Sequence, residues 1–371
     1  MSQEFSQDFI KSIVKGFRIP GDFIKGYSYG SGHINDTVAV EMSVGGAPLR
    51  FLLQRINNLI FKDIPGLMDN IARVTAQSQK ALAEANEIDA SRKALTLIET
   101  IDGKSFFTDS EGRAWRCYIF IEHATGFDII ETEHQAFEAS KAFAEFQKLL
   151  VDLPGERLNE TIPDFHHTPK RFETLKKAIE ADMHNRAAEV KKEIDFFMNR
   201  EALAGSLIKL NEEGKLPERV THNDTKLNNV LIDNKTNEAS CVIDLDTLMP
   251  GLSLYDFGDL VRTSTSPVAE DEKDASKVVM RMNMYESLVE GFLAGGRSFL
   301  TKDELDNLHT GGQVITMECG TRFLTDYLQG DTYFKTKYEG HNMVRCRTQI
   351  ALVESMETQV DAMLACVNKA I

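Results

Sequence analysis

Two short stretches decide the fold: VTHNDTKLNNVLID at 220–233, and VIDLDTLMPGLSLYDFGD at 242–259. Each joins a run of β-branched and apolar residues to a high density of Asp and Asn, and neither has a helical period. The first carries Asp224 and Asn229 in the pattern H-x-D-x-x-x-x-N. In the second, Asp244 ends the apolar segment CVID, which follows the turn DNKTNEA. The pattern predicts a hairpin that brings Asn229 and Asp244 to one end.

The residue types in these stretches suit phosphoryl transfer. Amide and carboxylate oxygens are hard donors that Mg²⁺ accepts beside phosphate oxygens, so Asn229 and Asp244 are candidate ligands. Asp224 is then free to receive the proton of an attacking hydroxyl. The alternative is that Asn and Asp only form turns, since both bond neighbouring backbone groups. Three features favour the catalytic interpretation: the His two residues before Asp224, the flanking strands, and the second strand end that carries an Asp.

Composition narrows the class of protein. The chain has 371 residues, 42% hydrophobic and 27% charged, which is typical of a soluble globular protein with two lobes. A net charge of −15 argues against nucleic acid or an anionic membrane as the main partner, although local cations can still hold an anionic ligand. Five scattered cysteines without a CxxC pair indicate reduced thiols. No apolar run is long enough for a membrane span. The N-terminal segment has the pattern of an amphipathic helix and not of a signal peptide. We therefore expect a cytoplasmic protein. The oligomeric state stays open.

The order of patterns predicts an α+β chain of two lobes. Residues 1–122 combine the glycine cluster GYSYGSGHINDTVAVEM, the strand candidates PLRFLLQRI, ALTLIET and WRCYIFIEH, and one helical segment, LMDNIARVTAQSQKALAEA. Residues 123–371 are mainly helical, with EHQAFEASKAFAEFQKLL first, a long, charged helical segment over 171–210, and helices again from 274 onward. No Pro/Gly/Ser-rich linker separates the two, so the boundary is a hinge.

The strings HNDTKLNN and IDLD resemble the catalytic and metal-binding loops of the aminoglycoside phosphotransferase and choline kinase branch of the protein-kinase-like fold. Further strings are similar to the N-acetylhexosamine 1-kinase subgroup of that branch: HINDT, FLLQRIN, IDLDTLMPGLSLYDFGD, ECGTRFLTDYLQGDTYF and HNMVRCRTQ. The resemblance spans about residues 20–360. It implies Asp224 as catalytic base, Asn229 and Asp244 as Mg²⁺ ligands, and Asp246 as a supporting carboxylate.

The resemblance also implies how the lobes divide the work. The small N-lobe, an antiparallel sheet over 1–122, would bind the nucleotide. The larger helical C-lobe over 123–371 would hold the catalytic loop, the metal loop and the sugar site.

The glycine-rich stretch before the first long strand is a candidate phosphate cover, because glycine lets backbone N–H groups approach phosphate oxygens. Hairpin turns use glycine too, and the polar side chains could instead cap such a turn. The candidate nucleotide contacts here are Gly30, Ser31, Gly32, His33 and Asn35.

The third strand lacks the Lys that protein kinases place there. FLLQRI offers Gln54 and Arg55, which point to opposite faces. Arg55 could bind phosphate oxygens bidentately; if Gln54 faces the cleft instead, the cation must come from elsewhere. Glu122 lies in WRCYIFIEHATG, which resembles the segment that binds adenine. Lys226 could approach the γ-phosphate, or pair with a surface acid.

The acceptor site is predicted on a helix in CGTRFLTDYLQGDTYF. Arg322 and Asp326 lie four residues apart and share a face. The pair could simply be solvated, but apolar neighbours make a pocket plausible, and an Arg–Asp pair with an aromatic ring suits a sugar. The resemblance implies sugar contacts for Arg322, Asp326 and Tyr327.

The resemblance implies an ATP- and Mg²⁺-dependent kinase that phosphorylates the anomeric hydroxyl of N-acetylhexosamine (GlcNAc or GalNAc). Its partners would be the sugar and the nucleotide. Within enzymes, the alternative is a kinase of another small alcohol, such as choline, an amino alcohol or another sugar; a choline site would want an aromatic cage. A non-catalytic nucleotide- or sugar-binding protein is the alternative from another class. The missing strand Lys favours it, whereas the presence of Asp224, Asn229 and Asp244 argues against it.

Overall fold

The computed structural model describes residues 5–30 and 34–371. They divide into two units: residues up to 125, with 152–163 and 231–249, form the first, and 126–151, 164–230 and 250–371 form the second. The first holds a small antiparallel sheet and the second is mainly helical. The predicted α+β, protein-kinase-like architecture is confirmed.

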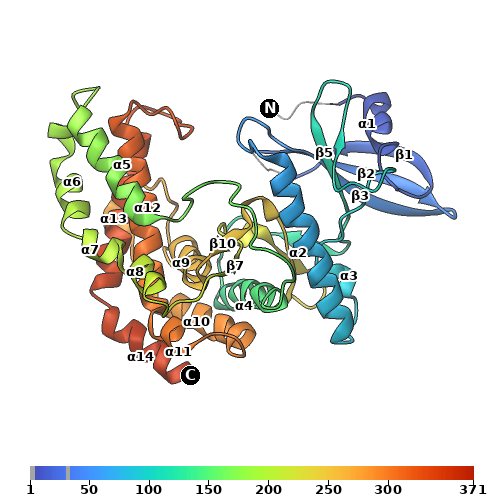
Figure 1. Cartoon of the computed structure of the whole chain (residues 1–371). Helices are drawn as coiled ribbons and strands as arrows, with labels where there is room; N and C mark the ends of the chain where they lie inside the picture. Colours follow the sequence, from blue (N-terminus) through green and yellow to red (C-terminus); the bar gives the residue numbers. More distant parts are fainter. Residues whose placement is uncertain (1–4, 31–33) are drawn as a thin grey trace. The chain divides into compact units, whose positions relative to one another are not determined.

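The first unit is built on a five-stranded antiparallel sheet of order β1-β2-β3-β5-β4 (Figure 1). The strands are β1 (Asp22–Ser28), β2 (Asp36–Val44), β3 (Ala47–Arg55), β4 (Phe107–Thr108) and β5 (Ala114–Ile119). Gly45 and Gly46 both have positive φ, 59° and 86°, as a two-residue hairpin turn between β2 and β3 requires. The strand predicted at ALTLIET is wrong: this segment makes only isolated bridges, at Leu97 and Thr100.

One face of this sheet is closed by α1 (Gln7–Val14). Ile10, Ile13 and Val14 of the helix pack with Phe51 and Trp115 of the sheet in one hydrophobic cluster. Side chains alternate between the faces of a strand, so Gln54 and the residue opposite it on β5 lie on the other face.

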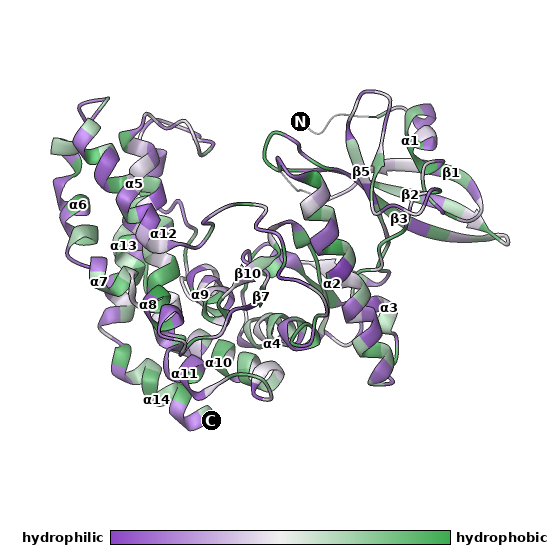
Figure 2. Cartoon of the chain, in the orientation of Figure 1, coloured by the Kyte–Doolittle hydropathy of each residue, from purple (hydrophilic) through white to green (hydrophobic). Residues whose placement is uncertain are grey.

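The helix predicted from LMDNIARVTAQSQKALAEA is confirmed as α2 (Ile64–Glu84), and α3 (Ala90–Lys93) follows it. Figure 2 shows both hydrophilic and hydrophobic residues along α2, as expected of a helix with one buried side. The buried Asn70 amide donates to the carbonyl oxygens of Asn159 (2.9 Å) and Leu248 (3.0 Å). Through it α2 holds the two later chain segments in the first unit.

The two stretches that decide the fold form the predicted hairpin. β8 (Val230–Asp233) pairs with β9 (Ala239–Val242), and β6 (Ala124–Gly126) adds a third strand. Asn229 directly precedes β8, and Asp244 follows two residues after β9. A second small sheet pairs β7 (Arg219–Thr221) with β10 (Met249–Gly251).

The helical unit is organised around α12 (Leu308–Leu328), which is buried along most of its length and packs against α5 (Thr168–Ala181), α9 (Ser253–Ser264) and α13 (His341–Glu357). α9 and α12 touch through glycines: a Cβ added at Gly258 would lie 2.3 Å from the Gly311 carbonyl oxygen. The remaining long helices are α4 (Glu133–Leu149), α10 (Met282–Gly296) and α14 (Val360–Ala370), and the short α11 (Lys302–Asp306) precedes α12.

The segment 171–210, predicted to be long, charged and helical, is mainly helical but is not one continuous helix. The segment is divided into the end of α5, η1 (Ala187–Val190), α6 (Lys191–Met198), α7 (Glu201–Ala204) and α8 (Ser206–Glu212). The first break is at Asp182, whose φ of 34° is left-handed. Its Oδ1 accepts the backbone N–H groups of Arg186 (2.8 Å) and Ala187 (3.0 Å). This side chain replaces the helical hydrogen bonds, which explains why α5 ends there.

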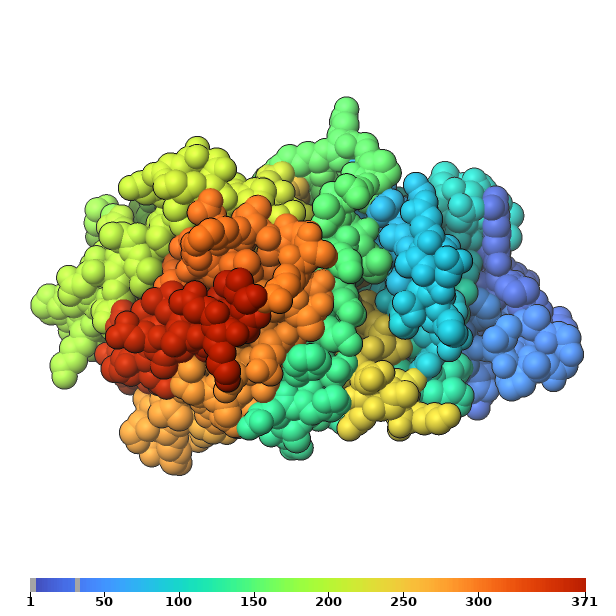
Figure 3. Space-filling model, turned by 90° about the horizontal axis from the view of Figure 1, so that it is seen from below, coloured from blue at the N-terminus to red at the C-terminus, as the bar shows by residue number. Residues whose placement is uncertain are grey.

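The C-terminal helix α14, red in Figure 3, lies on the surface of the helical unit against α10 and α11. Within residues 5–30 and 34–371, no helix has both the length and the apolar character needed to cross a bilayer.

Candidate active site

The predicted catalytic loop, residues 222–229, is fixed by a buried carboxylate of α9. Asp256 accepts the backbone N–H of His222 on Oδ2 (2.9 Å) and that of Asn223 on Oδ1 (2.7 Å). The Gln147 side chain donates to the same carboxylate at 2.6 Å. Asp256 is therefore a structural partner of this loop.

Asp224 lies at the centre of a small polar cluster in the loop. Lys226 Nζ lies 3.0 Å from its Oδ1, and Asn229 Nδ2 donates to its backbone oxygen (2.8 Å) and its Oδ2 (3.2 Å). Burial disfavours the charge of Lys226, but the Asp224 carboxylate outweighs it and raises the pKa of the lysine. The two site residues predicted from H-x-D-x-x-x-x-N are therefore in direct contact, with Lys226 beside them.

The orientation of Asn229 suits a metal ligand. Because its amide nitrogen is committed to Asp224, its carbonyl oxygen is the end left to meet a cation. Amide and carboxylate oxygens form the donor set that Mg²⁺ prefers. The residues present therefore fit the ion.

In the first unit, the metal-loop carboxylates have different surroundings. Asp244 is exposed and adopts a left-handed conformation (φ 60°) just before η3 (Leu245–Thr247). Asp246 is buried, and both of its oxygens are engaged, Oδ1 by Arg116 and Oδ2 by the Asn35 amide. Metal ligation by either residue stays a prediction, and these contacts favour Asp244.

A fully buried arginine on β5 lies on the face of the sheet that α1 does not cover. Arg116 lies opposite Gln54 in register, and its Nε donates to Gln54 Oε1 at 2.9 Å. Burial alone would lower its pKa, but the ion pair with Asp246 keeps the pKa of Arg116 raised. We did not predict this residue, because WRCYIFIEH has the pattern of a core strand and gives no sign that its Arg has a buried partner.

Arg55, the predicted phosphate anchor, has another partner. It forms an ion pair with Asp36, and its guanidinium lies 5.3 Å from the centre of the Phe5 ring. Its neighbour across the sheet is Trp115, on the face covered by α1. The structure thus places Gln54, and not Arg55, on the face that α1 does not cover.

The other predicted nucleotide contacts are partly described. Gly30 has a φ of 76°, which a side chain would disfavour, and Asn35 accepts the backbone N–H of Asn57 while it binds Asp246. Glu122 pairs with Arg50, whose guanidinium stacks 3.8 Å from the centre of the Phe120 ring. Ser31, Gly32 and His33 lie outside the described residues.

In the helical unit, Arg322 of α12 projects among aromatic rings. Its guanidinium lies 5.4–5.8 Å from the ring centres of Phe165, Tyr333 and Phe334, and it meets the Tyr333 hydroxyl at 3.4 Å. Among the described residues, no carboxylate lies within ion-pair distance of Arg322. An arginine with rings and no acid partner has the character of a ligand contact.

Asp326 and Tyr327 have other contacts. Asp326 accepts the backbone N–H groups of Thr332, Tyr333 and Phe334 and the Asn342 amide, all at 2.7–3.0 Å, so it shapes the loop that carries Tyr333. Tyr327 lies against Arg186, 4.5 Å from guanidinium to ring centre. Their sugar contacts stay predictions, and Tyr333 is the aromatic residue beside Arg322.

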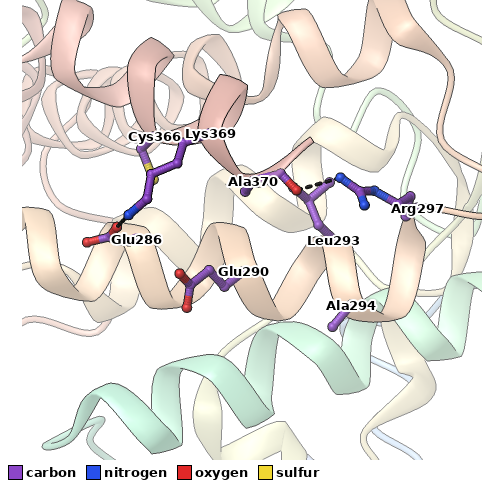
Figure 4. Close-up of a pocket in the computed structure, with 8 residues that line it drawn as sticks. All are labelled: Glu286, Glu290, Leu293, Ala294, Arg297, Cys366, Lys369 and Ala370. Carbon is purple, nitrogen blue, oxygen red and sulfur yellow. Dashed lines mark hydrogen bonds and ion pairs between the residues drawn. The ribbon is translucent and has the colours of Figure 1, made fainter.

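A hollow of about 470 Å³ lies elsewhere in the helical unit, between α10 and α14 (Figure 4). Two of its polar groups have partners: Lys369 meets Glu286 at 3.0 Å, and Arg297 donates to the Ala370 carbonyl at 2.5 Å. None of the predicted site residues lines it, and we assign it no function.

The model of the phosphotransferase enzyme family (APH) matches residues 28–286, more than half of the chain. The chain belongs to this family. Solved structures of similar fold include an aminoglycoside phosphotransferase from Alicyclobacillus acidocaldarius, which is 11% identical, with a TM-score of 0.60 over 97% of this chain and 96% of that one. A choline kinase from Cryptosporidium parvum is 14% identical, with a TM-score of 0.56 and 98% of each chain covered. A spectinomycin phosphotransferase in complex with ADP and spectinomycin is 12% identical, with a TM-score of 0.52 over 96% of this chain and 99% of that one.

At these identities the likeness establishes the fold of this phosphotransferase, and its substrate is a separate question. The fold also locates one departure. Protein kinases carry a Lys on the third strand that binds the nucleotide phosphates. In this phosphotransferase the corresponding face of β3 carries Gln54, and Arg116 of the adjacent strand lies opposite it and donates to its side chain.

Proposed function

We propose that this phosphotransferase is an ATP- and Mg²⁺-dependent kinase of N-acetylhexosamine that forms the sugar 1-phosphate. The observation that supports a kinase best is Asp224, held in a loop fixed by Asp256 and in contact with Lys226 and Asn229. Among the structures of similar fold, the spectinomycin enzyme carries ADP, which supports nucleotide use.

In this proposal Asp224 accepts the proton of the anomeric hydroxyl as that oxygen attacks the γ-phosphorus and the bond to the β–γ bridging oxygen breaks. Lys226, whose Nζ lies 3.0 Å from Asp224 Oδ1, would place positive charge beside the base, near the phosphoryl oxygens that gain negative charge. The Asp256 contacts hold the loop backbone still, so little reorganisation accompanies proton transfer.

Asn229 and Asp244 would hold Mg²⁺, which offsets negative charge on the nucleotide phosphates. Asp246 would instead be the anchor of the metal loop, because Arg116 and Asn35 already engage its two oxygens. Arg116 would then take the part of the strand lysine. It would place positive charge on the nucleotide face of the sheet and hold Asp246 in position.

The acceptor specificity is proposed from Arg322 and the aromatic side chains around it. A guanidinium donates to sugar hydroxyl or acetamide oxygens, and an aromatic ring covers the apolar face of a pyranose. Tyr333, 71% exposed beside Arg322, is suited to that contact. Subgroup strings such as ECGTRFLTDYLQGDTYF support N-acetylhexosamine in particular.

A kinase of an amino alcohol is the second candidate, because the choline kinase shares the fold. Arg322 and Arg171 argue against it. Burial and the nearby charge of Arg322 lower the pKa of Arg171, which shows that two cations share this region. A cationic acceptor would be repelled there, whereas a neutral sugar would not.

The experiment is ADP release measured with a panel of GlcNAc, GalNAc, glucose, choline and ethanolamine. We expect turnover with the two N-acetylhexosamines. Turnover of choline or ethanolamine alone would overturn the sugar assignment, and ADP release with none of the acceptors would overturn the kinase assignment.

A further inference from the structure

One buried histidine connects the helix that carries Arg322 with the loop that carries Asp224. His166 lies in the loop before α5, and its side chain is 8% exposed. Its Nδ1 lies 2.8 Å from Glu318 Oε1, and its Nε2 lies 3.2 Å from the backbone oxygen of Asn223. No motif marks His166 in the string FHHTP, so its role depends on contacts that only the fold brings together.

The Asn223 carbonyl belongs to the peptide bond that leads into Asp224. The N–H of Asn223 is held by Asp256, and its carbonyl oxygen is held by His166. Asn223 itself has a φ of 66°, which is uncommon for a residue other than glycine and must be maintained by such contacts. Asp256 and His166 therefore fix opposite ends of the residue before the proposed base.

The other end of the contact belongs to the acceptor helix. Glu318 is buried, and its second oxygen accepts the Thr168 hydroxyl at 2.8 Å, so its carboxylate is fixed. Arg322 follows Glu318 by four residues, one turn along the same side of α12. A ligand held by Arg322 is thus tied through α12, Glu318 and His166 to the peptide before Asp224.

The partners of His166 favour the doubly protonated ring. A carboxylate and a carbonyl oxygen only accept hydrogen bonds, so both ring nitrogens are satisfied only when both carry hydrogen. The acidic groups that face the ring are Glu318 from α12 and Asp259 from α9, and Tyr255 of α9 packs against it at 5.3 Å between ring centres. Burial opposes the charge, but Glu318 outweighs it and raises the pKa of His166.

We infer that His166 is a positioning residue for phosphoryl transfer: through Glu318 and the Asn223 carbonyl, it sets the orientation of Asp224 toward an acceptor held on α12. The inference rests on the proposed function for the role of Asp224, but it does not depend on which alcohol is the acceptor. His166 acts through the loop backbone and touches no reacting atom.

The test compares His166→Gln, which keeps one donor, with His166→Leu, which keeps none. His309→Gln on α12 is the matched control, since His309 is partly buried and lies outside the site. We expect kcat to fall about 100-fold in His166→Leu and about 10-fold in His166→Gln, because small misplacements of a catalytic group cost rates of this order. KM for ATP should stay within about twofold of the wild-type value, since the change affects orientation and not binding. Unchanged kcat in both His166 variants would overturn the inference.

Amide hydrogen exchange of residues 221–229 gives a readout that needs no turnover. Exchange should be faster in both His166 variants and unchanged in His309→Gln. Protection equal to the wild type in His166→Leu would also overturn the inference. If the wild-type enzyme phosphorylates none of the acceptors, the proposed function fails, and the exchange result still decides whether His166 holds the loop.

Discussion

Arg116 on β5 is hydrogen-bonded to Gln54 on β3 at 2.9 Å and ion-paired with Asp246 of the metal loop. The cation that the third strand lacks is therefore present on its neighbour. The charge lies on the face of the sheet that α1 does not cover, on the strand next to the one where protein kinases carry it.

This relationship predicts that a lysine on β3 can replace Arg116 of β5. Arg116→Met should weaken ADP binding about tenfold or more and destabilise the protein by about 3–5 kcal/mol, because it leaves the buried Asp246 carboxylate unpaired. The double variant Gln54→Lys with Arg116→Met restores a cation to β3 and should recover much of the affinity. Isothermal titration with ADP and Mg²⁺ measures the ADP affinity of the single and the double variant.

Two further variants complete that experiment. Arg113→Met is the control for losing an arginine close to this strand: Arg113 directly precedes β5 and pairs with Asp109, and the variant should bind ADP as the wild type does. Arg55→Met tests the sequence-based prediction. If Arg55→Met lowers the affinity and Arg116→Met does not, the anchor is Arg55 and the account of Arg116 is wrong.

Asp224→Asn should lower kcat by about 10²–10⁴-fold, the usual contribution of a general base, and should leave the affinity for ADP within about threefold. The amide replaces the carboxylate with a group of similar shape that cannot accept the proton. Single-turnover rates and ADP titration check the two parts. Asp274→Asn, at the N-cap of η4 (Ala275–Lys277) in an exposed loop, is the control. A rate close to wild type in Asp224→Asn would contradict the assignment of the base.

Arg322→Gln should raise the KM for the acceptor about 10- to 100-fold and change the KM for ATP little, since Arg322 contacts only the proposed acceptor region. Asp326→Asn should act differently. Its carboxylate holds three consecutive backbone N–H groups, so the variant should lose about 1–3 kcal/mol of stability, measured by denaturant unfolding. Equal KM effects in the two variants without any loss of stability in Asp326→Asn would support a direct sugar contact for Asp326 instead.

The His166–Glu318 pair predicts a pH window of stability. The pKa of His166 is raised from 6.5, so its contribution is complete below that value and is lost as the pH rises through the raised pKa. Burial would raise the pKa of Glu318, but His166, with Arg322 and Thr168, lowers it from 4.5, so its contribution is complete above 4.5 and is lost at lower pH. The Tm difference between wild type and His166→Gln should therefore be largest between about pH 4.5 and 6.5. A difference that does not vary with pH would refute the charged pair.

Local patterns in the sequence predicted those parts of the fold that depend on local chemistry. The 3.6-residue period gave α2 and α4 closely, and the Asp and Asn residues around 220–246 marked the hairpin and its loops. The helical segment 171–210 is not continuous because Asp182 offers its own hydrogen bonds to the backbone, a competition that periodicity does not register.

The site residues that the sequence did not predict have roles that depend on contacts in the folded protein. Alternation along β3 showed that Gln54 and Arg55 face opposite ways, but only the packing of α1 decides which face is closed. Arg116 and His166 owe their roles to Asp246 and Glu318, which lie 130 and 152 residues further along the chain. Tyr333, not Tyr327, lies beside Arg322 because Asp326 folds the following loop back onto α12.

The most direct test of the central claim is identification of the product formed from ATP, Mg²⁺ and GlcNAc or GalNAc by phosphorus NMR. The account predicts a sugar 1-phosphate, with the phosphorus coupled to the anomeric proton, formed together with an equal amount of ADP. Phosphate on another hydroxyl, or turnover of choline or ethanolamine but of neither hexosamine, would contradict it.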